Sequence, residues 1–449
     1  MKVGLVSLGC KVNQYELDAI GAELARRGYT CVGPDAVADA YCVNTCAVTS
    51  TSERKSRQLI RRLHNLNPEA AIVVMGCYSQ GAAGKVAALP GVRLVIGTDG
   101  RSRIPDWLDE FLGVGASVCD SEGGAEPQRT TPTVDVRTPY RLYEFEELPL
   151  ALTTHTRAVV KVQDGCSLFC TYCTIPHLRG PGRSRRPEAV LHEIGQLVAA
   201  GYKEIVLTGV HLAGYGEDLG DGWNLARLVA AIGNIEGLDR LRLSSLHPNE
   251  VDDELLSVLT GLDNFCPHFH LPIQTGDDDV LRRMRRRYTA AGILRLAETL
   301  RSIWPEVALT TDVITGFPGE SDEAFARTAS LCREVGFSRL HVCPFSARPG
   351  TPAARYPDQL PMQVREERAR QLIQIGNELA AAYHQRFLGR EVEVLAEEEE
   401  EGGGLVGLTR TYVRVHVDSP DGVGGLHQLL QVKVTAFDHE GLQAVHEVA

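Results

Sequence analysis

Residues 165–173 read GCSLFCTYC. This loop holds three cysteines, Cys166, Cys170 and Cys173, and no fourth cysteine follows nearby. Iron–sulfur clusters are usually held by four cysteine thiolates. A loop that offers three therefore predicts a cluster in which one iron keeps an open position for another ligand. That open iron is where we expect chemistry to take place.

A zinc site is the competing interpretation of this loop. His177 lies shortly after Cys173 and could complete a Cys₃His set. Small zinc modules, however, usually divide their ligands into two pairs separated by a longer spacer. Here all four candidates fall within one short stretch, which would strain a tetrahedron, so the pattern favours the iron–sulfur cluster.

The sequence before the loop alternates apolar runs, expected as strands at residues 3–8, 40–43 and 71–75, with helical patterns. This alternation indicates a parallel sheet covered by helices on both faces. Cys10, Cys46 and Cys77 each lie just past one of these strands. Open α/β sheets bind ligands at that edge, so we expect the three thiols to converge. Taken one at a time, each is better explained as a buried structural cysteine, and only the equivalent placement of all three favours a shared site.

The sequence from the loop onward repeats a strand–helix unit. Expected strands lie at residues 158–162, 204–208, 240–245, 268–273, 308–314 and 339–344, and expected helices at 187–200, 225–235, 277–303 and 323–335. Six such units predict a complete or partial barrel or, less well, a doubly wound sheet. The three-cysteine loop follows the first strand, which places it on the face where barrels carry their active sites.

The predicted fold class is α/β in three parts. These are an N-terminal open parallel α/β sheet over residues 1–115, a central partial (β/α)6 barrel over 156–387, and a small C-terminal β-barrel over 388–449. Residues 116–155, rich in glycine, proline and threonine, are expected to form a linker. The last part is expected to be a barrel because its residues alternate as strands do, with glycine turns between them.

Composition limits the possible partners and compartments. The chain has 449 residues and a formal net charge of −12, so any nucleic acid must be bound by local basic patches. Basic runs lie at residues 54–62, 179–186 and 282–287, and solvated helix surface is an equally good interpretation of each. Twelve cysteines are too few for a disulfide scaffold, and no apolar segment is long enough to span a bilayer. We expect a cytoplasmic protein without a membrane partner.

The loop C-x-x-x-C-x-x-C, with Tyr172 before the last cysteine, resembles the signature of radical S-adenosylmethionine enzymes. Three further motifs, LGCKVNQYE at 8–16, NTCAVT at 44–49 and GCYSQ at 76–80, resemble the cluster-binding motifs of the methylthiotransferases within that superfamily. The three-part order is similar to theirs along essentially the whole chain, and the last part resembles their TRAM domain, an RNA-binding appendage. Among subgroups, the chain most resembles the one that acts on N6-threonylcarbamoyladenosine.

The resemblance implies two 4Fe-4S clusters and S-adenosylmethionine as cofactors. Cys166, Cys170 and Cys173 would hold the radical-generating cluster, and Cys10, Cys46 and Cys77 an auxiliary cluster implicated in sulfur insertion. No catalytic residues beyond these ligands are implied. The implied S-adenosylmethionine pocket comprises Tyr172, Thr208, Gly209, Ser245, Gln274, Asp312, Ile314 and Gly316. For Ser245 and Gln274, a structural role at a strand end is an open alternative.

The implied reaction adds a methylthio group to C2 of N6-threonylcarbamoyladenosine at tRNA position 37. One S-adenosylmethionine would supply the methyl group and a second the radical that removes hydrogen from the C–H carbon. Expected partners are the tRNA anticodon stem-loop, a low-potential electron donor and an unspecified sulfur donor. The alternatives are isopentenyladenosine in tRNA, an aspartate of a ribosomal protein, or a non-catalytic iron–sulfur RNA-binding protein. His247 stands where this subgroup often has glutamate.

Overall fold

The N-terminal part is built on strands that are apolar on both faces. Every residue of β3 (Ala40–Thr45) and β4 (Ala71–Gly76) is buried, so helices must cover both sides of their sheet. The sheet has six parallel strands in the order β2-β1-β3-β4-β5-β6. Its other strands are β1 (Lys2–Ser7), β2 (Thr30–Val32), β5 (Val92–Ile96) and β6 (Thr133–Asp135), and its helices are α1 (Lys11–Arg26), α2 (Ser50–Leu66), α3 (Cys77–Gly81), α4 (Ala83–Ala87) and α5 (Ile104–Leu112).

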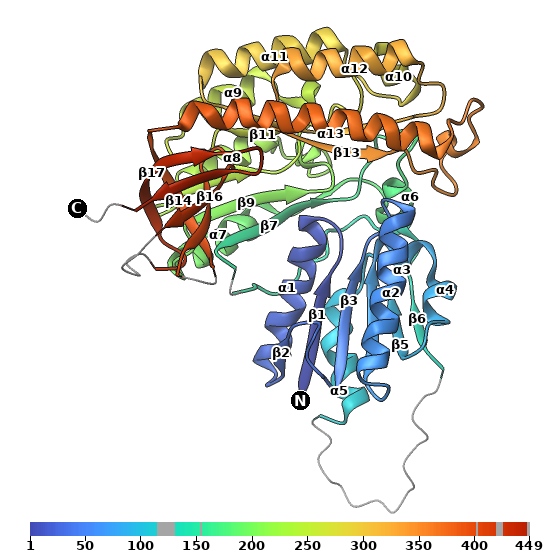
Figure 1. Cartoon of the computed structure of the whole chain (residues 1–449). Coiled ribbons are helices and arrows are strands. Elements are labelled where there is room, and N and C mark those ends of the chain that lie inside the picture. Colours follow the sequence, from blue (N-terminus) through green and yellow to red (C-terminus); the bar gives the residue numbers. More distant parts are fainter. Residues whose placement is uncertain (115–130, 153–154, 401–402, 419–424, 447–449) are drawn as a thin grey trace, which may run out of the picture.

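Three neighbouring strands of this sheet end level with one another. Ser7 of β1 pairs with Asn44 of β3, and Thr45 of β3 pairs with Gly76 of β4. The loops that follow these strands therefore leave the sheet at the same edge. That edge faces the central part of the chain in Figure 1.

The central part contains six parallel strands in two hydrogen-bonded groups, β10-β9-β7-β8 and β11-β12-β13. The groups meet where the N–H of Leu241 donates to the carbonyl of Asn264 and the N–H of Cys266 to that of Leu241, both over 2.8 Å. The short strand β8 (Arg183–Ser184) runs antiparallel to β7. The six parallel strands are β7 (Arg157–Asp164), β9 (Glu204–Gly209), β10 (Arg240–Leu243), β11 (His268–His270), β12 (Ala308–Thr315) and β13 (Arg339–Pro344).

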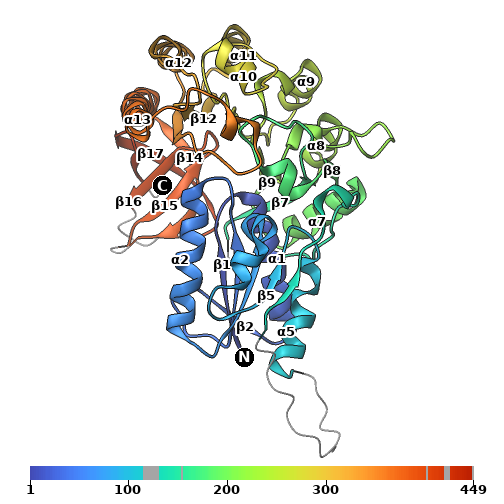
Figure 2. The same cartoon turned by 90° about the vertical axis from the view of Figure 1, so that its right-hand side faces the viewer.

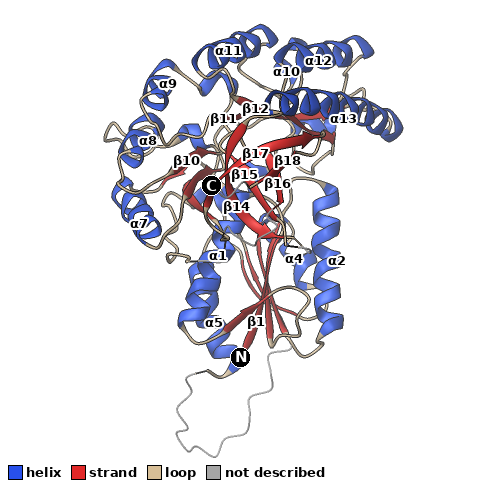
Figure 3. Ribbon diagram, turned by 60° about the vertical axis from the view of Figure 1, so that its left-hand side comes forward, coloured by secondary structure: helices blue, strands red, loops and turns tan. Residues whose placement is uncertain are grey.

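Helices α7 to α13 form an arc outside these strands (Figures 2 and 3). Most begin at a side-chain cap, as where Asn224 accepts the N–H of Arg227 over 2.8 Å before α8. The single helix expected at 277–303 is wrong, because Arg285 adopts a left-handed φ of 61° and breaks it in two. The helices of this part are α6 (Ile175–Arg179), α7 (Pro187–Ala199), α8 (Leu225–Gly233), α9 (Asp253–Thr260), α10 (Asp278–Arg283), α11 (Ala290–Ile303), α12 (Asp322–Val335) and α13 (Met362–His384).

The C-terminal part is a closed five-stranded barrel, β14-β15-β16-β18-β17. Its strands are β14 (Glu391–Glu399), β15 (Leu405–Thr409), β16 (Arg414–Asp418), β17 (Leu429–Phe437) and β18 (Leu442–Val445). Tyr412, in the turn between β15 and β16, anchors this barrel to the central part: its ring stacks on His268 with centroids 4.7 Å apart, and the Arg242 guanidinium lies 4.9 Å from it.

The computed structural model describes residues 1–114, 131–152, 155–400, 403–418 and 425–446. The predicted fold class, an open parallel sheet, a partial barrel of parallel strands and a small closed β-barrel, is confirmed. Much of the segment expected as a linker, with Cys119, lies outside the described residues, but its residues 133–135 form β6 of the N-terminal sheet. Within the described ranges, no helix combines the length and the apolar character needed to cross a membrane.

Candidate functional site

The loop with Cys166, Cys170 and Cys173 leaves the carboxyl end of β7 and folds back on itself. The N–H of Cys166 donates to the carbonyl of Gly180, and the N–H of Cys173 to that of Cys170, each over 3.0 Å. The turn before the loop requires glycine, since Gly165 has a φ of 71° and a Cβ there would lie 1.8 Å from a backbone oxygen. Burial raises the pKa of Cys166 to about 11 and that of Cys173 to about 12, and neighbouring thiols add to both shifts.

The second set of thiols converges at the level edge of the N-terminal sheet. Cys10 follows β1 and is exposed, whereas Cys46 and Cys77 are buried. A Cβ on Gly9 would lie only 3.3 Å from Sγ of Cys46, so the two loops touch. Burial raises the pKa of Cys77 to about 11, and the thiols of Cys10 and Cys46 act in the same direction. The expected convergence of the three is thus what the structure shows.

Neither set has the spacing of a zinc site. Four sulfurs around one Zn²⁺, at about 2.3 Å from it, stand about 3.8 Å apart. Among the described residues, the only trio of potential ligands with all donor atoms within 4.8 Å of one another lies elsewhere. His177, the fourth zinc ligand of the alternative, instead contacts Tyr140 and the ring of Phe169. Three thiols held farther apart suit an iron–sulfur cube, which is larger than a single ion.

Buried charges fill the interface between the two thiol sets. Glu16 on α1 and Asp164 at the end of β7 are at most 1% exposed, and each accepts hydrogen bonds from several cations. Burial alone would raise the pKa of both carboxyls, but the surrounding cations hold it below the ordinary value. The members of this buried charged cluster are Arg101, Lys161, Arg179, Arg183, Glu16, Glu146 and Asp164.

The residues expected to bind S-adenosylmethionine lie at the carboxyl ends of the barrel strands. Gln274 takes a left-handed φ of 66° and bridges to β12 beside Asp312. The carboxylate of Asp312 is half-exposed and lies 3.3 Å from Nε2 of His270. Burial raises the pKa of Asp312, but the hydrogen bond from His270 and the electrostatic effects of His270, His341 and Arg286 together outweigh it, and the net pKa is lowered. The other residues expected to bind S-adenosylmethionine are Thr208 and Gly209 at the end of β9, Ser245 after β10, Ile314 on β12, Gly316 after β12 and Tyr172 in the cysteine loop.

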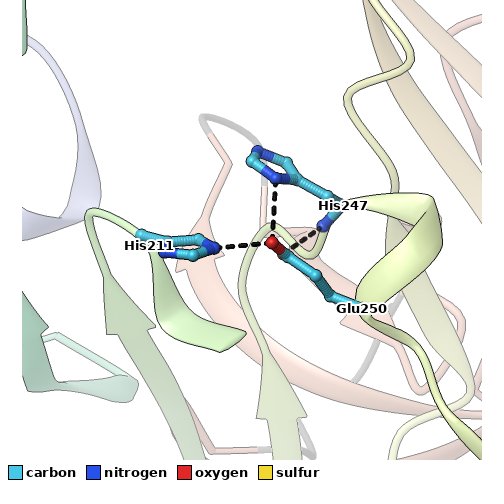
Figure 4. A group of neighbouring side chains, drawn as sticks. All are labelled: His211, His247 and Glu250. Atoms are coloured by element: carbon cyan, nitrogen blue, oxygen red, sulfur yellow. Dashed lines mark hydrogen bonds and ion pairs between the residues drawn. The ribbon is translucent and has the colours of Figure 1, made fainter. Parts of the chain in front are cut away.

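The compact trio of potential ligands is His211, His247 and Glu250 (Figure 4). Oε1 of Glu250 lies 2.7 Å from Nε2 of His211 and 3.2 Å from Nδ1 of His247. Nε2 of His247 accepts a hydrogen bond from Nη1 of Arg286 over 2.7 Å, which leaves the proton of a neutral imidazole on Nδ1, facing Glu250. A protonated Nδ1 and an adjacent guanidinium both disfavour a metal ion, so the trio is a hydrogen-bonded chain.

That chain ends at the cysteine loop. Nη2 of Arg286 donates to the hydroxyl of Tyr172 over 2.6 Å, and the guanidinium lies 5.8 Å from the ring centroid of Tyr172. Nε of Arg286 is buried and has no protein partner among the described residues. A cation in this position can receive the carboxylate of a bound amino acid.

Several of these residues were missed in the sequence. The basic run at 179–186 was expected to meet phosphate or solvent. That expectation is wrong for Arg179, Arg183 and Arg185, which are buried in ion pairs, and only Arg186 is exposed among the four arginines of the run. His211 and His247 each follow the end of a barrel strand, and that position was the available signal. Arg286 gave none, because it stands among other arginines.

Comparison with known proteins agrees with the geometry. Residues 160–332 match the model of the Radical SAM superfamily, and residues 2–97 that of the Uncharacterized protein family UPF0004. The chain is 16% identical to the radical S-adenosylmethionine methyltransferase TsrM from Kitasatospora setae, with a TM-score of 0.53 over 78% of this chain and 76% of that one. At that identity the likeness concerns the fold alone.

Curated relatives match nearly the whole chain. The threonylcarbamoyladenosine tRNA methylthiotransferase MtaB of Bacillus subtilis is 40% identical over 96% of this chain and 93% of its own length. The protein of the same name from Thermotoga maritima is 38% identical over 98% and 96%. The tRNA-2-methylthio-N(6)-dimethylallyladenosine synthase of Pelotomaculum thermopropionicum is 34% identical over 90% and 89%. With two thiol sets at one interface and relatives of this similarity and coverage, the chain belongs to the radical S-adenosylmethionine methylthiotransferase family.

Proposed function

We propose that the protein adds a methylthio group to C2 of N6-threonylcarbamoyladenosine at position 37 of tRNA. The observation that carries this proposal is the pair of three-thiol sets at one domain interface, since a second cluster site beside the radical site suits sulfur delivery. The choice of nucleoside rests on the relatives at 40% and 38% identity, which are named for threonylcarbamoyladenosine.

We assign one 4Fe-4S cluster to Cys166, Cys170 and Cys173 and a second to Cys10, Cys46 and Cys77. When bound to the first cluster, S-adenosylmethionine supplies the carbon radical, and it also supplies the methyl group. The protein side chains position these groups: Arg286 offers to a carboxylate its Nε, which has no partner among the described residues, and Asp312 offers a carboxylate for an amino group. Burial of Cys46, Cys77 and Cys170 and of the charges between the two sets limits the access of water to the reacting atoms.

Helix α2 supports a tRNA partner. Arg54, Lys55 and Arg61 are exposed on it, and the half-buried Arg57 donates to the hydroxyl of Tyr78, next to Cys77, over 3.1 Å. The helix begins just after the Cys46 loop and is about 25 Å long, so it can follow several phosphates of an RNA stem. We assign the anticodon stem to this surface, with the nucleotide of the loop directed to the interface.

The test is mass spectrometry of tRNA nucleosides from the native cells with and without the gene. Deletion should abolish the 2-methylthio form of threonylcarbamoyladenosine and leave the unmodified nucleoside in its place, and the wild-type gene should restore it. If 2-methylthio-dimethylallyladenosine is lost instead, the substrate is dimethylallyladenosine, the nucleoside in the name of the relative at 34% identity. Unchanged tRNA together with a lost ribosomal-protein modification would reject a tRNA substrate.

Cluster content is measured separately. Anaerobically reconstituted protein should bind about eight irons if two 4Fe-4S clusters are present. Cys170→Ala should abolish cleavage of S-adenosylmethionine and retain about half the iron. Cys46→Ala should also retain about half, but it should cleave S-adenosylmethionine without forming the methylthio product. Full activity in either variant would contradict its ligand assignment.

A further inference from the structure

One guanidinium, from the helix that follows the radical-site loop, reaches the second thiol set. Arg179 ends α6, the short helix that follows the radical-site loop, and is 1% exposed. Its Nε donates to Sγ of Cys77 over 3.3 Å. Its Nη2 donates over 2.9 Å to Oδ1 of Asn13, and Nδ2 of Asn13 donates to the carbonyl of Thr45, beside Cys46, over 3.2 Å. Arg179 therefore contacts the Cys77 thiol directly, and it reaches the loops of the other two cysteines through the side chain of Asn13.

Every N–H of this guanidinium has an acceptor. Nη1 donates to Oε1 of Glu16 and to Oδ1 of Asp164, both over 2.9 Å, and Nη2 also donates to Oε2 of Glu16 over 3.2 Å. An arginine has five N–H donors. Four of those of Arg179 meet oxygens and the fifth meets a sulfur, so the contact with Cys77 is part of a fully satisfied geometry. A lysine could not reproduce it.

The charges around Arg179 leave a place for a negative sulfur. The buried charged cluster contains four cations and three carboxylates. An unbalanced charge is costly in a buried site. Arg179 is the member of the cluster that contacts Cys77, so a thiolate there, bound to a metal cluster, would balance the surplus.

We propose that Arg179 is a positioning residue of the auxiliary cluster. Its guanidinium holds the Cys77 ligand by a charged hydrogen bond and raises the reduction potential of that cluster. The inference rests on the proposed function only in taking Cys10, Cys46 and Cys77 as cluster ligands. Reduction adds negative charge to a cluster, and a hydrogen bond to a ligand sulfur from a fixed cation favours the more negative state.

The test uses the full chain with Cys166, Cys170 and Cys173 changed to alanine, so that only the auxiliary cluster binds. Arg179→Gln and Arg183→Gln are compared in this background. Arg183 is the matched control because it is equally buried and donates to Asp164 over 3.1 Å, while its other hydrogen bonds within the described ranges go to backbone carbonyls and not to a thiol. The midpoint potential is measured by redox titration monitored by electron paramagnetic resonance.

Arg179→Gln should lower the midpoint potential by at least about 59 mV, the one-electron equivalent of a tenfold change, and Arg183→Gln should shift it far less. Loss of iron in Arg179→Gln with full iron in Arg183→Gln also supports the assignment. Equal shifts, no shift, or equal loss of iron would overturn it. If Arg179→Gln is insoluble, the charge-balanced pair Glu16→Gln with Arg179→Gln takes its place.

The outcomes separate this inference from the proposed function. If the background protein binds no cluster, the auxiliary site itself is wrong and the inference falls with it. If the cluster binds and its midpoint potential is the same with and without Arg179→Gln, only the inference fails. If the potential responds and cells lacking the gene keep normal tRNA, the inference stands and the proposed substrate does not.

Discussion

At the scale of single residues, Glu250 fixes the groups that surround the open face of the radical-site loop. It orients His211 and His247, and His247 in turn accepts a hydrogen bond from Arg286. Burial raises the pKa of Glu250, but hydrogen bonds from both imidazoles and electrostatic interactions with them outweigh it and lower the pKa to about 2, so Glu250 stays ionised at neutral pH. The chain therefore keeps one tautomer of His247 and one orientation of Arg286.

Glu250→Gln should weaken S-adenosylmethionine binding about tenfold, equivalent to about 1.4 kcal/mol, because Arg286 would lose its fixed acceptor. Iron content should stay unchanged, since the hydrogen bonds of Glu250 among the described residues go to His211 and His247 and to no thiol. Equilibrium dialysis with the reconstituted protein measures the affinity. Asp253→Asn, an exposed carboxylate at the start of α9, is the control and should bind normally. Normal affinity in Glu250→Gln would show that the chain does not position the cofactor.

At the scale of elements, the turn between β4 and α3 presents Cys77. Gly76 has a φ of 99°, and a Cβ there would lie 2.2 Å from Oδ1 of Asn44 and 2.6 Å from the carbonyl of Thr45. Gly76→Ala should displace Cys77 and remove about four of the about eight irons expected for two clusters. Iron and sulfide analysis measures this.

Gly84→Ala is the control for that variant. Gly84 is exposed on α4, and a Cβ there meets nothing within 4 Å. Alanine should therefore stabilise the helix by about 0.5–1 kcal/mol and leave the iron content unchanged. Full iron in Gly76→Ala would mean that the turn tolerates a side chain.

The surface of α2 is tested by the salt dependence of RNA binding. Replacing Arg54, Lys55 and Arg61 together with glutamine should lower the slope of log affinity against log salt by about 2 to 3, since each lost phosphate contact removes about 0.7–0.9. Fluorescence anisotropy with an anticodon stem-loop RNA measures the slope. The triple glutamine variant of Arg295, Arg333 and Arg370, exposed on the outer helices, is the control and should keep it. An unchanged slope in the α2 variant would place the RNA elsewhere.

The sequence was most informative where periodicity and strand ends determine the structure. Strands apolar on both faces predict the parallel sheets, and cysteines just past three strand ends predict their convergence. The helix expected at 277–303 was wrong because the left-handed Arg285 gives no signal in a run of arginines. Sequence patterns also could not pair β6 with β5, since three residues are too few to show alternation.

At the scale of the whole molecule, the domain interface depends on Glu16. This carboxylate is fully buried and pairs with Arg101, Lys161 and Arg179. Sequence patterns could not place it there, because burial of a charge follows from partners that lie far away in the chain. The three buried arginines within residues 179–186 were misread for the same reason.

Glu16→Gln should destabilise the iron-free protein by about 3–5 kcal/mol at pH 7, since it leaves buried cations unpaired. The pKa of Glu16 is lowered in the folded protein, so its stabilisation is complete above the ordinary value of 4.5 and is lost as the pH falls below that value. The difference between variant and wild type should therefore shrink on acidification. Thermal unfolding at pH 7 and below pH 4.5 measures it.

Glu23→Gln provides the comparison on the same helix. Glu23 is partly exposed and pairs with Arg26 and Arg27 at the surface. Surface pairs contribute little to stability. The free energy of unfolding of this variant should therefore fall by less than about 1 kcal/mol, and its difference from wild type should not change on acidification. A similar loss in both variants would mean that Glu16 contributes no more than a surface charge.

The position of Arg179 in the chain also has a consequence for biosynthesis. The thiols of Cys10, Cys46 and Cys77 leave the ribosome well before Arg179 does. Until then the nascent sheet carries Glu16 and the three thiols without the cation that joins them. We therefore expect the charged surroundings of Cys77 to be complete only after Arg179 has been translated and its helix has docked on the sheet.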